Sequence, residues 1–246
     1  MTQVKFTKSF LYQSDIVIFM GILDIFRKTE KNTNYQPFEV EETKKGDYET
    51  FYKKLLNTSL IILIVGKRGS GKTAFGMKLI ELFMKKSKRK CYCLGFEEAK
   101  LPWSIKKSEN IESVPNNSIA LIDEGAILFS SRDSMKSPNK ELSKFMAIAR
   151  HKNLTLIIIT QNSALVDVNV LRLADTLMFK EPSLLQSTFE RKAIKEMYEK
   201  ASKMFKNKDD KEKYTYVWDD EFEGLLSFSL PEFWNEKISK SFKNLK

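Results

Sequence analysis

A glycine-rich run with a lysine and a threonine at its end has the spacing of a phosphate-binding loop. It reads Gly66-x-x-x-x-Gly71-Lys72-Thr73, the Walker A pattern. Its glycines let the backbone curl so that successive N–H groups point inward at phosphate oxygens. Lys72 brings positive charge to the β- and γ-phosphates, and the Thr73 hydroxyl is a ligand for Mg²⁺. The spacing predicts a site for ATP with Mg²⁺. The residues expected around the phosphates are Gly66, Lys67, Arg68, Gly69, Ser70, Gly71, Lys72, Thr73 and Ala74.

The segments on either side of this run support the prediction. Residues 59–65 are apolar and predict a buried strand, and residues 74–86 have a helical pattern. The phosphates would then also lie at the positive N-terminus of a helix.

Two adjacent acids end a second apolar strand, residues 118–123. In a parallel sheet ligands bind at the carboxyl edge, where the phosphate loop also lies. We expect Asp123 to hold Mg²⁺, partly through water, and Glu124 to act as the general base for the attacking water. The pair therefore predicts hydrolysis as well as binding.

A third apolar strand, residues 154–160, leads into Gln161. Its amide can donate to the γ-phosphate or the attacking water and accept in return, so Gln161 is a candidate catalytic sensor. Arg150, just before this strand, is a candidate arginine finger for the nucleotide of an adjoining subunit. Arg172 is the second choice, with a local pair to Asp175 as the competing interpretation.

The chain has 246 residues, with 42 Lys and Arg against 32 Asp and Glu, a net charge of +10. This surplus favours a polyanionic partner, either nucleic acid or an anionic membrane surface. Cys91 and Cys93 alternate on a predicted strand and are expected to be reduced core residues of an intracellular protein. We see no secretory signal and no apolar run long enough to span a bilayer.

Alternating strands and helices predict an α/β fold with a mostly parallel central sheet. Strands are expected near residues 59–65, 90–95, 118–123, 154–160 and 175–179. Helices are expected near residues 72–86, 139–150, 163–172 and 184–204. Residues 214–218 and 225–229 predict a β-hairpin, and Pro231 is a candidate start for a last short helix.

The chain is divided by these patterns into three parts. Residues 1–50 are an N-terminal element and connector, 51–205 the ATPase core, and 206–246 a hairpin with a basic tail. Residues 10–26 are apolar but interrupted by two aspartates. They are expected to pack against the core or a neighbouring subunit, with a membrane-surface anchor as the alternative.

Together, the loop at 66–73, the acids at 123–124, Arg150 and Gln161 resemble the additional-strand P-loop ATPases. This resemblance implies an α/β fold with a three-layer, RecA-like P-loop NTPase core around a mostly parallel central sheet. Within these, residues 55–205 resemble the FtsK/HerA group, particularly the genome-packaging ATPases of icosahedral viruses with an internal membrane. They also resemble the zonula-occludens-toxin-like proteins of filamentous phages. The first resemblance implies a homo-oligomeric ring, a hexamer, that moves double-stranded DNA through its centre without reading sequence. It also implies that Arg150 acts in trans.

Such a ring needs a loop that grips DNA, and residues 129–140 are the candidate. Arg132, Lys136 and Lys140 can contact phosphates without reading bases. The resemblance implies a cytoplasmic protein, in the host if viral, with a capsid, portal or membrane-vertex partner. The alternative, which the filamentous-phage resemblance suggests, is a nucleotide-switched assembly or export ATPase at a membrane. Lys67 adds to it, because ParA/MinD-like switch ATPases carry a lysine five residues before the Walker A lysine, although they have glycine where this chain has Arg68. A small-molecule kinase is a third class, but no acceptor-binding apparatus is recognisable.

Overall fold

The computed structural model describes residues 35–96, 99–123, 138–160, 168–182, 192–235 and 238. The chain divides into two units, Met1–Tyr35 and Gln36–Lys246. All described helices and strands lie in the second unit.

The second unit is built on a nine-stranded sheet with the order β1-β9-β8-β7-β2-β6-β5-β3-β4. The strands from β7 to β4 in this order run parallel. Their bounds are β2 Ile61–Val65, β3 Cys91–Leu94, β4 Ile105–Lys107, β5 Ile119–Asp123, β6 Thr155–Thr160 and β7 Thr176–Phe179. Because β6 lies between β2 and β5, the strand before the phosphate loop and the strand ending in Asp123 are separated by an additional strand.

An antiparallel extension continues the sheet beyond β7. It consists of β8 (Tyr214–Trp218), β9 (Phe222–Ser227) and the edge strand β1 (Glu39–Gly46). The 3₁₀ turn η3 (Lys211–Lys213) leads into β8, and a second turn, η1 (Ile111–Ser113), precedes β5. The C-terminal hairpin predicted from the sequence therefore belongs to the same sheet as the nucleotide-binding strands.

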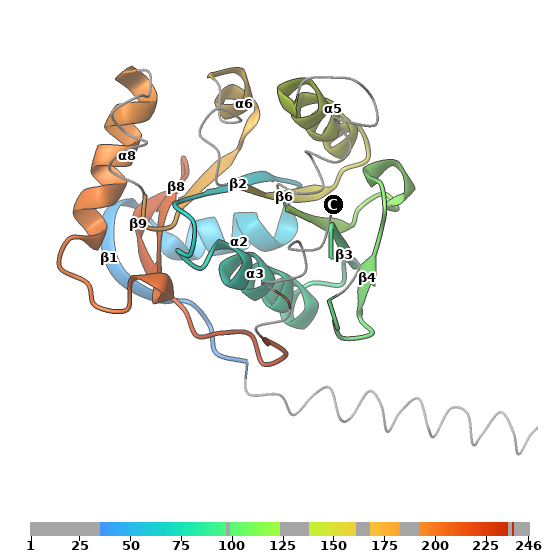
Figure 1. Ribbon diagram of the computed structural model, residues 1–246, viewed down its shortest axis with the longest axis horizontal. Coiled ribbons are helices and arrows are strands. Elements are labelled where there is room, and N and C mark those ends of the chain that lie inside the picture. The colour runs from blue at the N-terminus through green and yellow to red at the C-terminus, as the bar shows by residue number, and fades with distance from the viewer. Residues whose placement is uncertain are drawn as a thin grey trace, which may run out of the picture. The chain divides into compact units, whose positions relative to one another are not determined.

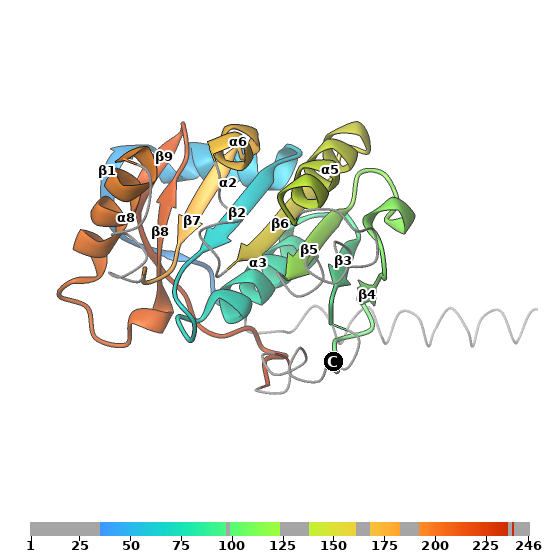
Figure 2. The same cartoon turned by 45° about the horizontal axis from the view of Figure 1, so that its top comes forward.

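Helices cover both faces of the sheet, so the fold has three layers (Figures 1 and 2). On one face lie α5 (Pro138–His151), α6 (Val168–Leu173) and α8 (Lys192–Phe205), and on the other lie α2 (Tyr48–Asn57) and α3 (Lys72–Lys86). Strands β2, β3, β5 and β6 are buried along their whole length, which explains their continuous apolar runs. The predicted fold class is confirmed.

Helix α3 approaches the sheet closely because Gly76 has no side chain. A Cβ on Gly76 would lie 2.8 Å from Ile159 Cδ1 and 3.1 Å from Leu121 Cδ1. Ile159 and Leu121 lie on β6 and β5, so the helix crosses these two strands near their carboxyl ends. Its first turn, one turn before Gly76, is thereby carried to the edge where β5 and β6 end.

The elements predicted for the core agree with the structure, but two terminal assignments do not. Residues 39–50, assigned to a connector, form β1 and the first turn of α2. Every residue of β1 is exposed, so this edge strand carries charges on both faces and shows no apolar alternation. Residues 231–235 form a turn and irregular backbone, so no helix begins at Pro231.

Arg89 joins several segments at the amino edge of the parallel strands. Its guanidinium donates five hydrogen bonds of 2.7–3.2 Å. The acceptors are the carbonyls of Thr58, Asn117, Ser118 and Asn153 and Oγ1 of Thr155. The basic run at residues 85–90 thus contains a structural residue, and this explains Arg89 without a nucleic-acid partner.

Replacing Arg89 should destabilise the fold. Arg89→Met leaves carbonyls at three loop ends without their donor, so we expect the free energy of unfolding to fall by about 2–4 kcal/mol. Urea denaturation followed by circular dichroism measures this. Lys88→Met is the control, because Lys88 is exposed, and should change stability by less than about 0.5 kcal/mol. Equal stabilities of the two variants would contradict the role given to Arg89.

Candidate nucleotide site

The loop between β2 and α3 has the backbone that phosphate binding requires. Gly69 and Gly71 have φ values of +79° and +82°, which other residues rarely adopt. Gly71 is the N-cap residue of α3 in the left-handed region and has no side-chain cap. Because Gly71 has no side chain that could accept hydrogen bonds from the first N–H groups of α3, these groups are suited to bind an anion.

Lys72 lies within the curve of this loop. Its ammonium donates to the carbonyl oxygens of Gly66 (2.9 Å) and Lys67 (2.8 Å), and the residue is only 6% exposed. The positive charge is thus held where the β- and γ-phosphates of a bound nucleotide would meet it. Thr73, the next residue, is half-buried in the first turn of α3.

Asp123 ends β5 at the same edge of the sheet. Its partner in register on β6 is Ile159, and the next residue of β6, Thr160, is paired with Val65 of β2. The ends of β2, β6 and β5 therefore lie side by side, and Asp123 is 8% exposed. The parallel register brings Asp123 to the edge from which the phosphate loop starts.

The residues at this edge fit a magnesium ion that is held together with a nucleotide. Among the described residues, no group of three His, Cys, Asp or Glu could hold a metal ion alone. A Mg²⁺ ion that is bound together with a triphosphate needs fewer protein ligands, because it uses one or two protein oxygens together with phosphate oxygens and water. Thr73 and Asp123 supply oxygens of the required kind.

The end of β7 adds two residues that the sequence analysis missed. Lys180 is fully buried, and its ammonium donates to the carbonyls of Glu212 (2.7 Å) and Tyr214. It also lies 4.5 Å from the centre of the Phe228 ring. Burial lowers the pKa of Lys180 well below its usual range. In the sequence, the adjacent Lys180 and Glu181 directly after an apolar strand could have indicated these two residues.

Glu181 connects the phosphate loop to η3. Its carboxylate lies 2.6 Å from Lys67 Nζ and 3.0 Å from Lys211 Nζ, and its carbonyl accepts from the N–H of Lys67. Burial raises the pKa of Glu181, but the hydrogen bonds from Lys67 and Lys211 outweigh this and leave the pKa lowered. Lys67, predicted to line the phosphates, therefore has its ammonium on a carboxylate of the same chain.

Several predicted site residues lie outside the described residues: Glu124, Gln161, Arg132 and Lys136. Glu124 and Gln161 directly follow the last residues of β5 and β6, and their roles stay predictions. Lys140 is exposed in the first turn of α5.

Arg150 lies at the opposite edge of the sheet from the phosphate loop. Its guanidinium donates to the carbonyl of Leu173 at 2.7 Å and is 3.4 Å from Asp175 Oδ1. Asp175 in turn accepts from the N–H of Ile61, the first residue of β2. Arg150, rather than Arg172, thus makes the pair with Asp175. Arg150 is distant from the nucleotide site of its own chain, and Arg172 is exposed on α6.

Cys91 and Cys93 are both buried and free, as expected. Burial raises the pKa of the Cys91 thiol to about 12 and that of Cys93 also well above its usual value. No helix within the described ranges is long and apolar enough to cross a membrane.

Comparisons with known proteins indicate an NTPase. A family model described as Novel STAND NTPase 3 matches residues 45–203, more than half of the chain. No curated protein matches the sequence. The similar solved structures include a viral packaging NTPase and a conjugation coupling protein. The genome packaging NTPase B204 from Sulfolobus turreted icosahedral virus 2, in complex with AMP, has a TM-score of 0.50 at 14% identity. That likeness covers 71% of this chain and all of the other.

The second structure is the pCW3 conjugation coupling protein TcpA with ATPγS, with a TM-score of 0.49 at 15% identity. It covers 77% of this chain and 66% of that one. At such identities the likeness is one of fold. At that level the B204 structure confirms the resemblance to the viral packaging ATPases that the motifs indicated.

Removing the loop lysine should weaken nucleotide binding. Lys72→Ala loses the charge held at the centre of the loop, so we expect the Kd for ATPγS to rise at least about tenfold. Isothermal titration calorimetry measures this. Lys86→Ala, at the exposed other end of the same helix, should bind as the wild type does. Equal affinities of the two variants would contradict the assignment of the phosphate loop.

Proposed function

We propose that this chain, which belongs to the novel STAND NTPase 3 family, hydrolyses ATP to move double-stranded DNA, as a genome-packaging motor. One observation carries the enzymatic part of the proposal. The phosphate loop after β2 and the carboxylate of Asp123 on β5 meet at one edge of the sheet, with β6 between their strands. A charge-neutralising lysine and a carboxylate at the same edge support the binding of a triphosphate there.

In this site the residues divide the work of phosphoryl transfer. Lys72 and the loop N–H groups bind the phosphates. Thr73 and Asp123 would hold Mg²⁺, and that ion would supply positive charge to the phosphate oxygens. Glu124 takes a proton from the attacking water, and Gln161 orients that water by donating and accepting hydrogen bonds. Both residues follow strands that end beside the loop.

The proposed DNA partner rests on charge and on the nature of a structural relative. A net charge of +10 suits a polyanion, and Lys140 is exposed at the end of the basic segment 129–140. The packaging NTPase with the same fold acts on a viral genome, as its description states. Phosphate contacts from lysine and arginine are independent of sequence, as movement along DNA requires.

The proposed ring, a hexamer, rests on Arg150. Its side chain is 51% exposed and lies across the sheet from the nucleotide site of its own chain. Because Arg150 is far from the nucleotide of its own chain, a role in hydrolysis would require its guanidinium to leave Leu173 and Asp175 and meet the nucleotide of another subunit. There it would stabilise transition-state charge, an effect worth about 10³–10⁵ in rate. Arg172 is the second choice for this role.

A nucleotide-switched assembly or export ATPase at a membrane is the second candidate. It rests on the resemblance to the zonula-occludens-toxin-like proteins, and Lys67 was an added indication, because ParA/MinD-like switch ATPases carry a lysine at this position. The ion pair of Lys67 with Glu181 occupies its ammonium within the chain, and this gives the second candidate no support.

DNA should accelerate hydrolysis by the assembled protein. We expect double-stranded DNA to raise the steady-state ATPase rate, and the effect to fall steeply between about 50 and 200 mM salt. Glu124→Gln should reduce hydrolysis by about 10²–10⁴-fold with and without DNA. Glu109→Gln is the control, because Glu109 is exposed and distant in sequence from the site.

An ATPase rate unchanged by DNA at every salt concentration would contradict the motor. If anionic liposomes raised the rate while DNA did not, the second candidate would replace it.

A further inference from the structure

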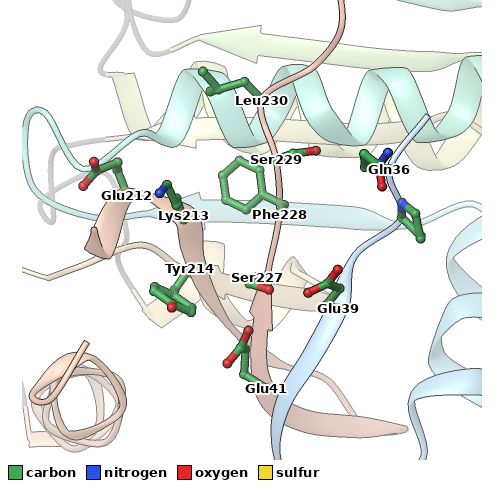
Figure 3. A pocket seen from close by; sticks show the side chains of 11 residues that line it. Gln36, Glu39, Glu41, Glu212, Lys213, Tyr214, Ser227, Phe228, Ser229 and Leu230 are labelled. Carbon is green, nitrogen blue, oxygen red and sulfur yellow. The ribbon is translucent and has the colours of Figure 1, made fainter. Parts of the chain in front are cut away.

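A cavity of about 610 Å³ lies between the antiparallel extension of the sheet and η3 (Figure 3). Glu39 and Glu41 of β1 lie on one side of it, Glu212 and Lys213 on the other, and Phe228 between them. The lining residues are Gln36, Pro37, Glu39, Glu41, Glu212, Lys213, Tyr214, Ser227, Phe228, Ser229 and Leu230. Its volume is typical of sites for small organic ligands.

The wall formed by Glu212 is in contact with the phosphate loop. A Cβ on Gly71 would lie 3.2 Å from the Glu212 carbonyl oxygen and 3.3 Å from its Cβ. Gly71 precedes Lys72 and caps the helix to which the phosphates bind. Glu212 therefore lies between the phosphate loop and the cavity, and a ligand held by the loop has to extend past Glu212 to enter it.

Lys180 fixes that wall in place. Its ammonium donates to the carbonyls of Glu212 and Tyr214, which lie on either side of Lys213. The start of its side chain packs against the loop, since a Cβ on Gly66 would lie 2.8 Å from Lys180 Cβ. The cavity wall and the phosphate loop are thus attached to the same buried residue and keep a fixed separation.

The lining has the chemistry of a nucleoside site. Tyr214 offers aromatic surface to a base, and Pro37 and Leu230 add apolar contacts. Phe228 also lines the cavity, but it is only 6% exposed because it packs against Phe75 and lies under the ammonium of Lys180. Ionised carboxylates accept hydrogen bonds only, which suits ribose hydroxyls and exocyclic amino groups. Hydrogen bonds from Ser227 and then Lys208 lower the pKa of Glu41, so this carboxylate stays ionised at neutral pH.

We propose that this cavity binds the nucleoside of the triphosphate whose phosphates the loop holds. Tyr214 contacts the base, and the carboxylate of Glu39 accepts from the ribose or an amino group. This assignment rests on the proposed nucleotide binding and adds the residues that distinguish ATP from bare polyphosphate. It does not depend on DNA.

The test compares ATPγS with tripolyphosphate, which has the phosphates but no nucleoside. Glu39→Trp places a bulky side chain in the cavity, and Thr43→Trp, exposed on the same strand but outside the lining, is its control. We expect the ratio of the two affinities to fall at least about tenfold in Glu39→Trp and to stay unchanged in Thr43→Trp. The loss of the Glu39 carboxylate charge changes the affinity for both ligands, so this effect cancels in the ratio. Ser229→Trp, which fills the cavity from another segment, should behave as Glu39→Trp does.

Three results would overturn the proposal. The first is a wild-type protein that binds ATPγS no more tightly than tripolyphosphate. The second is an unchanged affinity ratio in both cavity variants, and the third is a wild type that binds neither ligand. If the wild type binds ATPγS through the cavity but DNA does not change its rate of ATP hydrolysis, the motor function is contradicted. The nucleoside site is then still supported.

Discussion

The parallel register of the central strands is the constraint on which the site depends. Because β7, β2, β6 and β5 run in one direction, the residues that follow them emerge at one edge. The strand interiors are fully apolar and buried, so polar groups are confined to the strand ends. Gly76 then allows α3 to lie close on β5 and β6, which brings the first turn of the helix to the same edge.

An antiparallel extension adds to the parallel core of the sheet. Strands β8, β9 and β1 continue the sheet beyond β7, and η3 returns to the phosphate loop. Lys180 and Glu181, at the end of β7, bind both the loop and η3. A lysine buried this completely is costly unless its donors are satisfied, and the carbonyls of Glu212 and Tyr214 satisfy two of them. The loop and the C-terminal hairpin are therefore held together as one site.

Much of the core could be predicted because its signals are local. Apolar runs, the Walker A spacing and polar residues at strand ends identified β2, β5, β6 and α3 within two residues of their observed bounds. The edge strand β1 could not be predicted, because exposure on both faces removes the alternation that marks a strand. The roles of Arg89 and Lys180 depend on carbonyl oxygens far along the chain, which no local pattern encodes. Arg150 lies far from the nucleotide site of its own chain because α5 ends at the opposite edge of the sheet. No local pattern in the sequence shows in which direction this helix runs.

The central claim is that the phosphate loop and Asp123 together hold a magnesium nucleotide. The most direct test is calorimetric titration of ATPγS with and without Mg²⁺, in the wild type and in Asp123→Asn. The account predicts that Mg²⁺ tightens binding to the wild type, and that Asp123→Asn loses most of this gain while still binding ATPγS through the loop. A wild type whose affinity for ATPγS is the same with and without Mg²⁺ would contradict the claim.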